Sequence, residues 1–305
     1  MNNFYEKSLF NTENYFRGNF LECQCRSGIG SARYYAGGDG AARHPYHRAK
    51  HVRRRRLRPR RSLSPFPSLI MDRLVEPEWL DELPVDDPRA LRSRQDLRRV
   101  NVLMGHARIL SRRLRQAGAE RRMDCLIDLG AGDGSFLLEL LTRLGPTFQW
   151  RRIVLVDRQQ VRNSAAVEEF KPIGCEVEIV AADAFEWLAG RSMEDGVMMI
   201  ANLFLHHFSG EQLQLLFRLA AAGCDLFVAC EPRRSALPLL ASRLLGLIGG
   251  NDVTRHDAVA SVRAGFAGRE LTALWPADSG WELCEEAAGL FSHCFVATRS
   301  AERPA

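Results

Sequence analysis

The stretch that decides the fold is Ile127-Asp128-Leu129-Gly130-Ala131-Gly132-Asp133-Gly134. Apolar residues lead into it, and the helix-like run Ser135–Leu141 follows it. Glycines let a backbone turn sharply and approach a ligand closely, and the first N–H groups of a helix are free to bind one. A buried strand, a glycine turn and a helix in this order predict a nucleotide-binding corner.

The glycine spacing narrows the choice of nucleotide. The dinucleotide-binding fingerprint is G-x-G-x-x-G, whereas this turn reads G-x-G-x-G from Gly130 to Gly134. An acidic residue, Asp128, lies inside the strand just before the turn. A carboxylate there would repel a pyrophosphate but could accept a hydrogen bond from an ammonium group. The corner therefore favours a nucleotide that carries an amino-acid tail.

Alternating strands and helices follow the corner. Such alternation calls for a parallel sheet with helices on both faces. Ser209, three residues before Gln212, predicts a capping box at the start of one helix. The predicted strands are 124–129, 152–157, 176–181, 196–201 and 225–230, the predicted helices are 135–144, 160–171, 184–190 and 209–222, and a terminal antiparallel pair is expected at 280–284 and 293–298.

The sequence before the corner divides into two parts. Residues 1–70 lack hydrophobic periodicity and carry 14 Lys and Arg against 4 Asp and Glu. We interpret them as a disordered basic extension, or as sequence upstream of a true start at Met71. Residues 71–123 predict a helical cap, in which Asp86 or Asp87 caps a helix starting at Pro88 and Gly105 breaks it in two.

Charge and composition exclude several classes of function. Residues 71–305 hold 28 Lys and Arg against 33 Asp and Glu, so this part lacks the basic surface of a nucleic-acid-binding domain. The 8 cysteines form no C-x-x-C pair and lie mostly in apolar runs, which predicts neither disulfides nor a metal site. Neither a signal peptide nor an apolar run long enough to span a membrane is visible. We expect a cytoplasmic protein; its oligomeric state does not follow.

Two further carboxylates and a histidine pair follow later strands. Asp157 ends the strand 152–157, where an acidic side chain typically binds ribose hydroxyls. Asp183 ends the next strand and precedes Ala184. The fourth strand runs into Asn202-Leu203-Phe204-Leu205-His206-His207-Phe208.

These four motifs, in this order, resemble class I S-adenosylmethionine-dependent methyltransferases of the small-molecule type. The resemblance covers about residues 124–232. It implies a Rossmann-like, doubly wound, seven-stranded and mostly parallel α/β sheet with a terminal antiparallel strand pair, preceded by N-terminal helices. It also implies S-adenosyl-L-methionine as cofactor. The cofactor-binding residues that it implies are Asp128, Gly130, Ala131, Gly132, Gly134, Asp157, Asp183, Ala184 and Asn202.

The residues that would act on the methyl acceptor are less well defined. In the resembled family the insertion after the fifth strand, here 233–275, commonly shapes the substrate pocket. His256 could deprotonate a phenol there, or could belong to an ordinary helix start capped by Asp252 or Thr254. His206 is a second candidate base, with a packing role as the alternative. The segment Glu231–Arg234 is a further candidate for the pocket edge.

The apolar run 235–248 indicates a hydrophobic small molecule as the acceptor, such as a phenolic, polyketide-like or quinone-type compound. The expected reaction is methyl transfer to an oxygen or a carbon. No nucleic acid is expected as partner, and no membrane-spanning segment is expected. Two alternatives stay open. One is an NAD- or FAD-dependent oxidoreductase, and the other is a non-catalytic or nucleic-acid-associated protein that uses the Arg-rich N-terminus.

Overall fold

The computed structural model describes residues 71–84, 86–116, 123–158, 168–191, 194–277 and 280–300. The predicted basic extension over 1–70 and most of the predicted helix 160–171 lie outside the described residues. No helix among the described residues has both the length and the apolar character to cross a membrane.

A seven-stranded sheet forms the centre of the fold, in the order β3-β2-β1-β4-β5-β7-β6. Neighbouring strands are parallel except where β7 pairs with β5 and β6. The predicted fold class is therefore confirmed. The strands are β1 (Cys125–Leu129), β2 (Arg152–Asp157), β3 (Glu176–Ala181), β4 (Val197–Asn202), β5 (Leu226–Pro232), β6 (Trp281–Ala288) and β7 (Ser292–Arg299).

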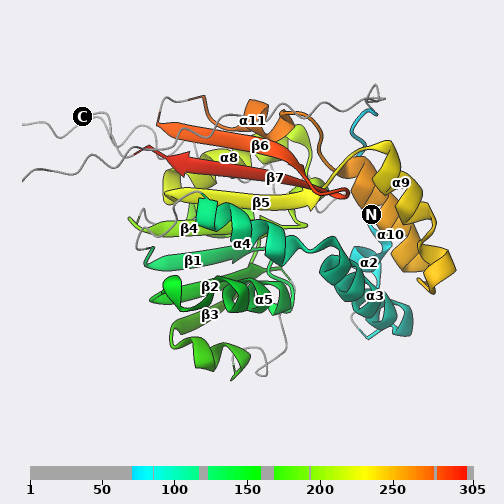
Figure 1. Ribbon diagram of the computed structural model, residues 1–305, viewed down its shortest axis with the longest axis horizontal. Helices are drawn as coiled ribbons and strands as arrows, with labels where there is room; N and C mark the ends of the chain where they lie inside the picture. The colour runs from blue at the N-terminus through cyan, green and yellow to red at the C-terminus, as the bar shows by residue number, and fades with distance from the viewer. Residues whose placement is uncertain are drawn as a thin grey trace, which may run out of the picture. The chain divides into compact units, whose positions relative to one another are not determined.

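Helices cover both faces of the sheet and its carboxyl edge (Figure 1). The longer ones are α3 (Pro88–Met104), α4 (His106–Gln116), α5 (Ser135–Leu144), α8 (Gly210–Gly223), α9 (Ala236–Arg243) and α10 (Asp252–Ala264). The shorter ones are α2 (Trp79–Glu82), α7 (Ala184–Ala189) and α11 (Glu270–Leu274), and the 3-10 turns are η1 (Gly145–Thr147), η2 (Lys171–Ile173), η3 (Leu205–His207) and η4 (Leu245–Ile248).

Capping residues close in the sequence define the ends of several helices. The Asp87 carboxylate accepts the Arg89 N–H, as expected of an N-cap before Pro88, and Gly105 ends α3 in a left-handed conformation. The predicted capping box at Ser209 is present at the start of α8. One expectation is wrong: Asn251, rather than Asp252 or Thr254, caps α10, because its side chain accepts the Thr254 N–H.

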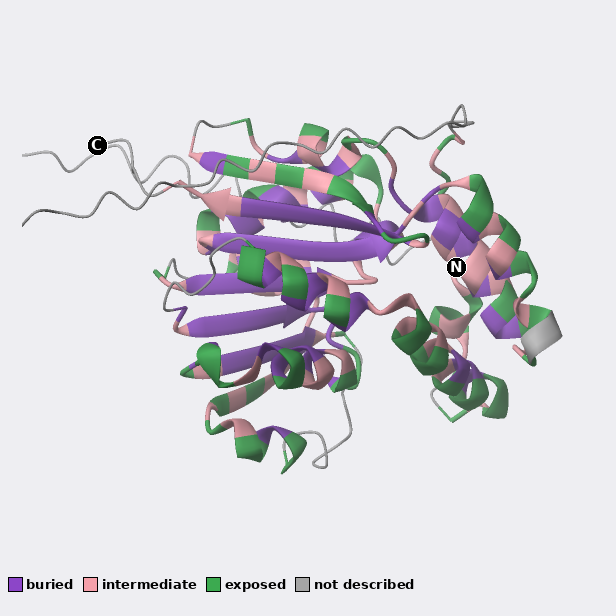
Figure 2. Ribbon diagram, in the orientation of Figure 1, coloured by how far each residue is buried: buried purple, intermediate pink, exposed green. Residues whose placement is uncertain are grey.

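Two apolar cores lie on the two faces of the sheet, because strand residues alternate between the faces. One core joins α7, α8 and α11 to side chains such as Ile127 and Phe227. The other joins α4 and α5 to side chains such as Leu126 and Ile200. The inner strands β1, β4 and β5 are almost wholly buried in Figure 2, so both faces of the sheet need this cover there, whereas the edge strands β3 and β6 are partly exposed.

The remaining helices lie beyond the sheet. In Figure 1, α2, α3, α9 and α10 gather past the edge at which β5 ends. Helix α10 packs against α2, α3, α9 and η3, so the N-terminal helices and the insertion after β5 form one assembly. Open α/β sheets bind ligands at this carboxyl edge. The fold therefore places the insertion 233–275 beside the edge where the predicted cofactor residues end their strands.

Candidate active site

The glycine turn after β1 has the strained geometry that its sequence predicts. Gly130, Gly132 and Gly134 have positive φ angles of 72°, 56° and 76°. A Cβ at Gly130 would lie 2.3 Å from the Phe204 ring, so no other residue fits there. A Cβ at Gly132 would meet nothing within 4 Å. Gly132 thus faces open space, whereas the absence of a side chain at Gly130 lets the Phe204 ring pack against the backbone.

Asp128 is a buried carboxyl group near the end of β1. Only 2% of the residue is exposed, and none of the described residues donates a hydrogen bond to it. Burial, assisted by the nearby Asp157 charge, raises the pKa of Asp128 to about 8. A buried ionisable group normally finds a partner, since an unpaired one costs folding energy. Such a group at the carboxyl edge is a candidate for ligand contact.

Two other predicted residues hold the neighbouring strand ends. The Gly132 N–H donates to Asp157 Oδ2 at 2.9 Å, which ties the end of β2 to the glycine turn. Asp183 Oδ1 accepts the Phe185 N–H at 2.8 Å and so caps α7, whose first residue, Ala184, is buried. The structure therefore brings Asp128 and Asp157 together at the turn, whereas Asp183 has a local capping role.

Asp133 binds the first residue of the helix that follows it, α5. Its Oδ1 accepts hydrogen bonds from the Ser135 N–H at 3.1 Å and the Ser135 hydroxyl at 2.6 Å. Arg98 from α3 lies 3.0 Å from the other carboxylate oxygen. This ion pair connects the glycine turn after β1 to helix α3.

Asn202 at the end of β4 belongs to a buried polar chain. His106 Nδ1 lies 2.8 Å from Asn202 Oδ1, and its Nε2 lies 2.9 Å from the Ser292 hydroxyl. Burial lowers the pKa of His106, which favours the neutral ring. A neutral ring satisfies both contacts if Nδ1–H donates to Asn202 and Nε2 accepts from Ser292. Sequence reasoning missed His106, because its partners are remote in the chain.

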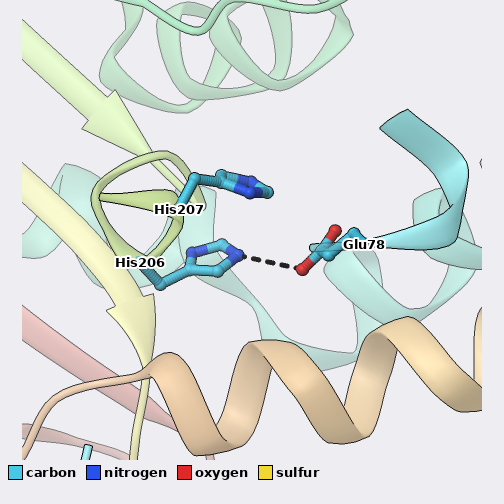
Figure 3. Close-up of side chains that lie close together, drawn as sticks. All are labelled: Glu78, His206 and His207. Atoms are coloured by element: carbon cyan, nitrogen blue, oxygen red, sulfur yellow. Dashed lines mark ion pairs between the residues drawn. The ribbon is translucent and has the colours of Figure 1, made fainter. Parts of the chain in front are cut away.

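His206 lies between two carboxylates (Figure 3). Its Nδ1 is 2.7 Å from Glu231 Oε2, and its Nε2 is 3.4 Å from Glu78 Oε1. Burial opposes protonation of the ring, but hydrogen bonds to Glu231 and Glu78 outweigh it and raise the pKa of His206 to about 9. Both ring nitrogens are thus engaged. The predicted base role of His206 stays a prediction.

The His207 ring lies beside the His206 ring, tilted by 33°, and differs from it electrostatically. The ring centroids are 4.2 Å apart. Burial, followed by the repulsion of the His206 charge, lowers the pKa of His207 to about 4. One histidine of the pair is therefore charged and the other neutral at neutral pH.

Glu231 holds this region in place. It lies fully buried at the end of β5. Its Oε1 accepts the N–H groups of Phe204 at 3.0 Å and Leu205 at 2.9 Å, besides the contact with His206. The sequence predicts the segment Glu231–Arg234 at the pocket edge, which stays a prediction; within it, Glu231 anchors the loop after β4.

Glu78 comes from the segment just before α2. Burial tends to raise its pKa, but the hydrogen bond to His206 and the charges of the two histidines lower the pKa of Glu78 to about 2. The Ser261 hydroxyl of α10 also contacts the Glu78 carboxylate. The three elements α2, η3 and α10 therefore meet at this one side chain.

His256 lies on α10 and has a different set of partners. Its Nδ1 lies 2.9 Å from Asp257 Oδ1, and its ring stacks on Trp79 with centroids 4.0 Å apart. Asp257 also accepts the Trp79 N–H at 2.8 Å. The His256 side chain is 36% exposed. A carboxylate on Nδ1 leaves Nε2 directed elsewhere, which is the arrangement of a general base.

His256 also lines a cavity of about 530 Å³. Its wall combines one face of α10 with the N-terminal segment around Trp79 and the end of α9. The lining residues are Glu76, Trp79, Arg243, Asp252, Arg255, His256, Val259, Ala260 and Arg263. Most of them belong to the insertion 233–275.

The strand order, in which β7 alone is reversed, and the glycine turn after β1 decide the fold. It is the fold of the class I methyltransferases. No protein-family model matches the sequence, and no curated protein matches it either.

Many solved structures match the fold, at low identity. An O-methyltransferase family protein from Burkholderia thailandensis is 17% identical with a TM-score of 0.47, and the match covers 72% of this chain and 62% of that one. A plantazolicin methyltransferase, solved with a substrate analogue and S-adenosylhomocysteine, is 12% identical with a TM-score of 0.49, over 70% and 91% of the two chains. Human N-acetylserotonin methyltransferase, solved with S-adenosylmethionine, is 13% identical with a TM-score of 0.41, over 72% and 61%.

The buried pair of Glu231 and His206 should be important for stability. We expect Glu231→Gln to lower the free energy of unfolding by about 3–5 kcal/mol, because it removes the nearer of the two carboxylates that pair with the buried His206 ring. Chemical denaturation measures this change. The exposed Glu282→Gln on β6 is the control and should stay within about 0.5 kcal/mol of the parent. A Glu231→Gln protein as stable as the control would contradict the anchoring role.

Proposed function

We propose that this protein transfers the methyl group of S-adenosylmethionine to an oxygen or a carbon of a hydrophobic small molecule. The observation that carries the proposal is the buried Asp128 carboxyl near the end of β1, which accepts no hydrogen bond from the part of the chain that the structure describes and lies next to the open space over Gly132. The sulfonium of the bound cofactor activates the methyl group. The protein's part is to hold the reactants in line and to exclude water.

The residues at the carboxyl edge fit this cofactor. Asp128 would accept a hydrogen bond from the ammonium of the amino-acid tail, which would supply the donor that the described residues lack. Asp157 already lies beside Gly132, where it would accept hydrogen bonds from ribose hydroxyls. Asp183, Ala184 and Asn202 would border the adenosine. The glycines Gly130, Gly132 and Gly134, with Ala131, would let the backbone approach it.

The acceptor would bind in the insertion 233–275. The cavity beside α10 has a volume within the range of small-molecule sites. The neighbouring helix α9 exposes Leu237 and Leu240, with Leu244 just past its end, an apolar stripe suited to a hydrophobic ligand. His256, oriented by Asp257, would take the proton of an acceptor hydroxyl there.

Titration calorimetry with S-adenosylhomocysteine tests the cofactor directly. We expect binding of S-adenosylhomocysteine and none of NADH. Asp128→Ala combined with Gly132→Val should abolish that binding, because the first removes the ammonium partner and the second fills the space over the turn.

A matched control separates ligand contact from backbone strain. Gly174 also has a positive φ, 75°, and open space around its Cβ position, but it precedes β3 and lies at the opposite end of that strand from the site. Gly174→Val should bring a comparable backbone strain and leave S-adenosylhomocysteine affinity unchanged. Binding of NADH alone, or full S-adenosylhomocysteine affinity in the Asp128 and Gly132 double variant, would refute the proposed cofactor.

The affinity for S-adenosylhomocysteine should depend on pH. In the free protein the pKa of Asp128 is raised to about 8 by burial, so the carboxyl is protonated at lower pH. The ligand's ammonium favours the carboxylate, so binding below pH 8 must release a proton. Affinity should therefore rise by up to about tenfold per pH unit from pH 6 to 8 and level off above that.

The control for this pH dependence is Asp128→Asn, which should bind weakly and show no slope over the same range. Calorimetry at several pH values in matched ionic strength measures both proteins. An equal slope in the parent and in Asp128→Asn would assign the titration to another group.

His256→Ala tests the proposed base. We expect turnover, measured by release of S-adenosylhomocysteine once an acceptor is known, to fall about 10²–10⁴-fold. Cofactor affinity should change little, because His256 lies on α10 and not at the glycine turn. An unchanged turnover rate would remove His256 from the site.

A further inference from the structure

Three metal-ligating side chains converge beside the carboxyl edge of the sheet: Glu78, His206 and His207. One ligand atom from each lies within 4.8 Å of the others. The histidines come from η3 and the glutamate from the segment before α2. In Figure 3 both imidazole rings and the carboxylate point into the same small space. Two imidazoles and one carboxylate form a common ligand set for divalent transition metals.

The separation between two of these ligands is one that a metal ion could bridge. His206 Nε2 and Glu78 Oε1 are 3.4 Å apart. A charge-assisted N–H···O bond is about 2.7–2.9 Å long. Two ligands bound at about 2.0–2.1 Å to a tetrahedral zinc ion are separated by about 3.3 Å. The pair is thus spaced as it would be with an ion between its members.

The surroundings of these side chains are also those of a metal site. Ligating histidines usually donate their second ring nitrogen to a carboxylate, which fixes the ring and leaves the other nitrogen for the metal. Glu231 does this for His206, with 2.7 Å between Oε2 and Nδ1. Glu78 is held in turn by the Ser261 hydroxyl. Glu231 is itself fully buried and fixed by backbone N–H groups of η3.

We propose that Glu78, His206 and His207 bind one divalent transition-metal ion, such as Zn²⁺. Imidazole ligands disfavour Mg²⁺ and Ca²⁺, which prefer oxygen. Three protein ligands leave at least one coordination position for water or for an oxygen-bearing ligand, as in catalytic zinc sites. An ion there would lower the pKa of a hydroxyl bound to it. The sequence predicted no metal site, because Glu78 is far from the histidines in the chain.

The test uses the full chain, freed of metal with a chelator and then titrated with Zn²⁺ by calorimetry and with Co²⁺ by visible absorption. We expect one tightly bound equivalent. Glu78→Gln and His207→Ala should each weaken it at least about tenfold, and Glu231→Gln about 10–100-fold, since it orients a ligand without touching the ion. Glu282→Gln, exposed on β6, is the matched control and should bind as the parent does.

The design separates this site from other sources of metal binding. His44, His47 and His51 can bind Zn²⁺ too, but they are present in every variant and contribute equally. Circular dichroism checks that each variant folds. If His207→Ala does not fold, the metal affinity of Glu78→Gln decides the test, because Gln is close in shape to Glu. Absence of a tight equivalent in the parent, or its retention in Glu78→Gln, overturns the proposal. Because these titrations need no cofactor, their outcome is independent of the proposed methyl transfer.

Discussion

The hydrogen bonds around Glu231 hold the carboxyl edge of the sheet together. This buried carboxylate at the end of β5 accepts backbone N–H groups from the loop after β4 and the imidazole of His206. It thereby fixes Phe204, whose ring packs so closely on Gly130 that no Cβ fits between them. One side chain therefore links β5 and η3 to the glycine turn after β1.

Asp128 provides the contrast that points to function. Both carboxyl groups are buried at strand ends, but Glu231 is surrounded by donors and Asp128 has none among the described residues. Burying a carboxyl group without a hydrogen-bond partner lowers the stability of the folded protein, unless a bound ligand supplies the missing partner. A protein under selection for stability alone would have little reason to keep that cost. The asymmetry between two similar groups is thus better explained by ligand binding than by packing.

The sequence predicted best what depends on local pattern. Strand ends, the glycine turn, the N-cap at Asp87 and the capping box at Ser209 each follow from residues within a few positions of one another. The α10 cap was misassigned to Asp252 or Thr254, because neighbouring polar residues compete for the same role and Asn251 lies one position earlier. Helix ends predicted from the local sequence are commonly displaced by one or two residues in this way.

The contacts around the histidines could not be predicted in this way. Glu78, His106 and Ser261 are separated from their partners by most of a domain, and only the tertiary fold brings them together. A buried histidine between two carboxylates has no sequence pattern. The His206-His207 dipeptide indicates where the two rings lie along the chain. The protonation state of each ring depends on neighbours that are remote in the sequence.

A crystal structure with S-adenosylhomocysteine bound tests the role of Asp128 most directly. We expect the ligand's ammonium to lie within hydrogen-bonding distance of Asp128, about 2.7–3.2 Å, and its ribose to lie beside Asp157. The space over Gly132 would then hold the amino-acid tail. A ligand bound elsewhere, or bound at the turn with Asp128 still unpaired, would contradict the central role given to this carboxylate.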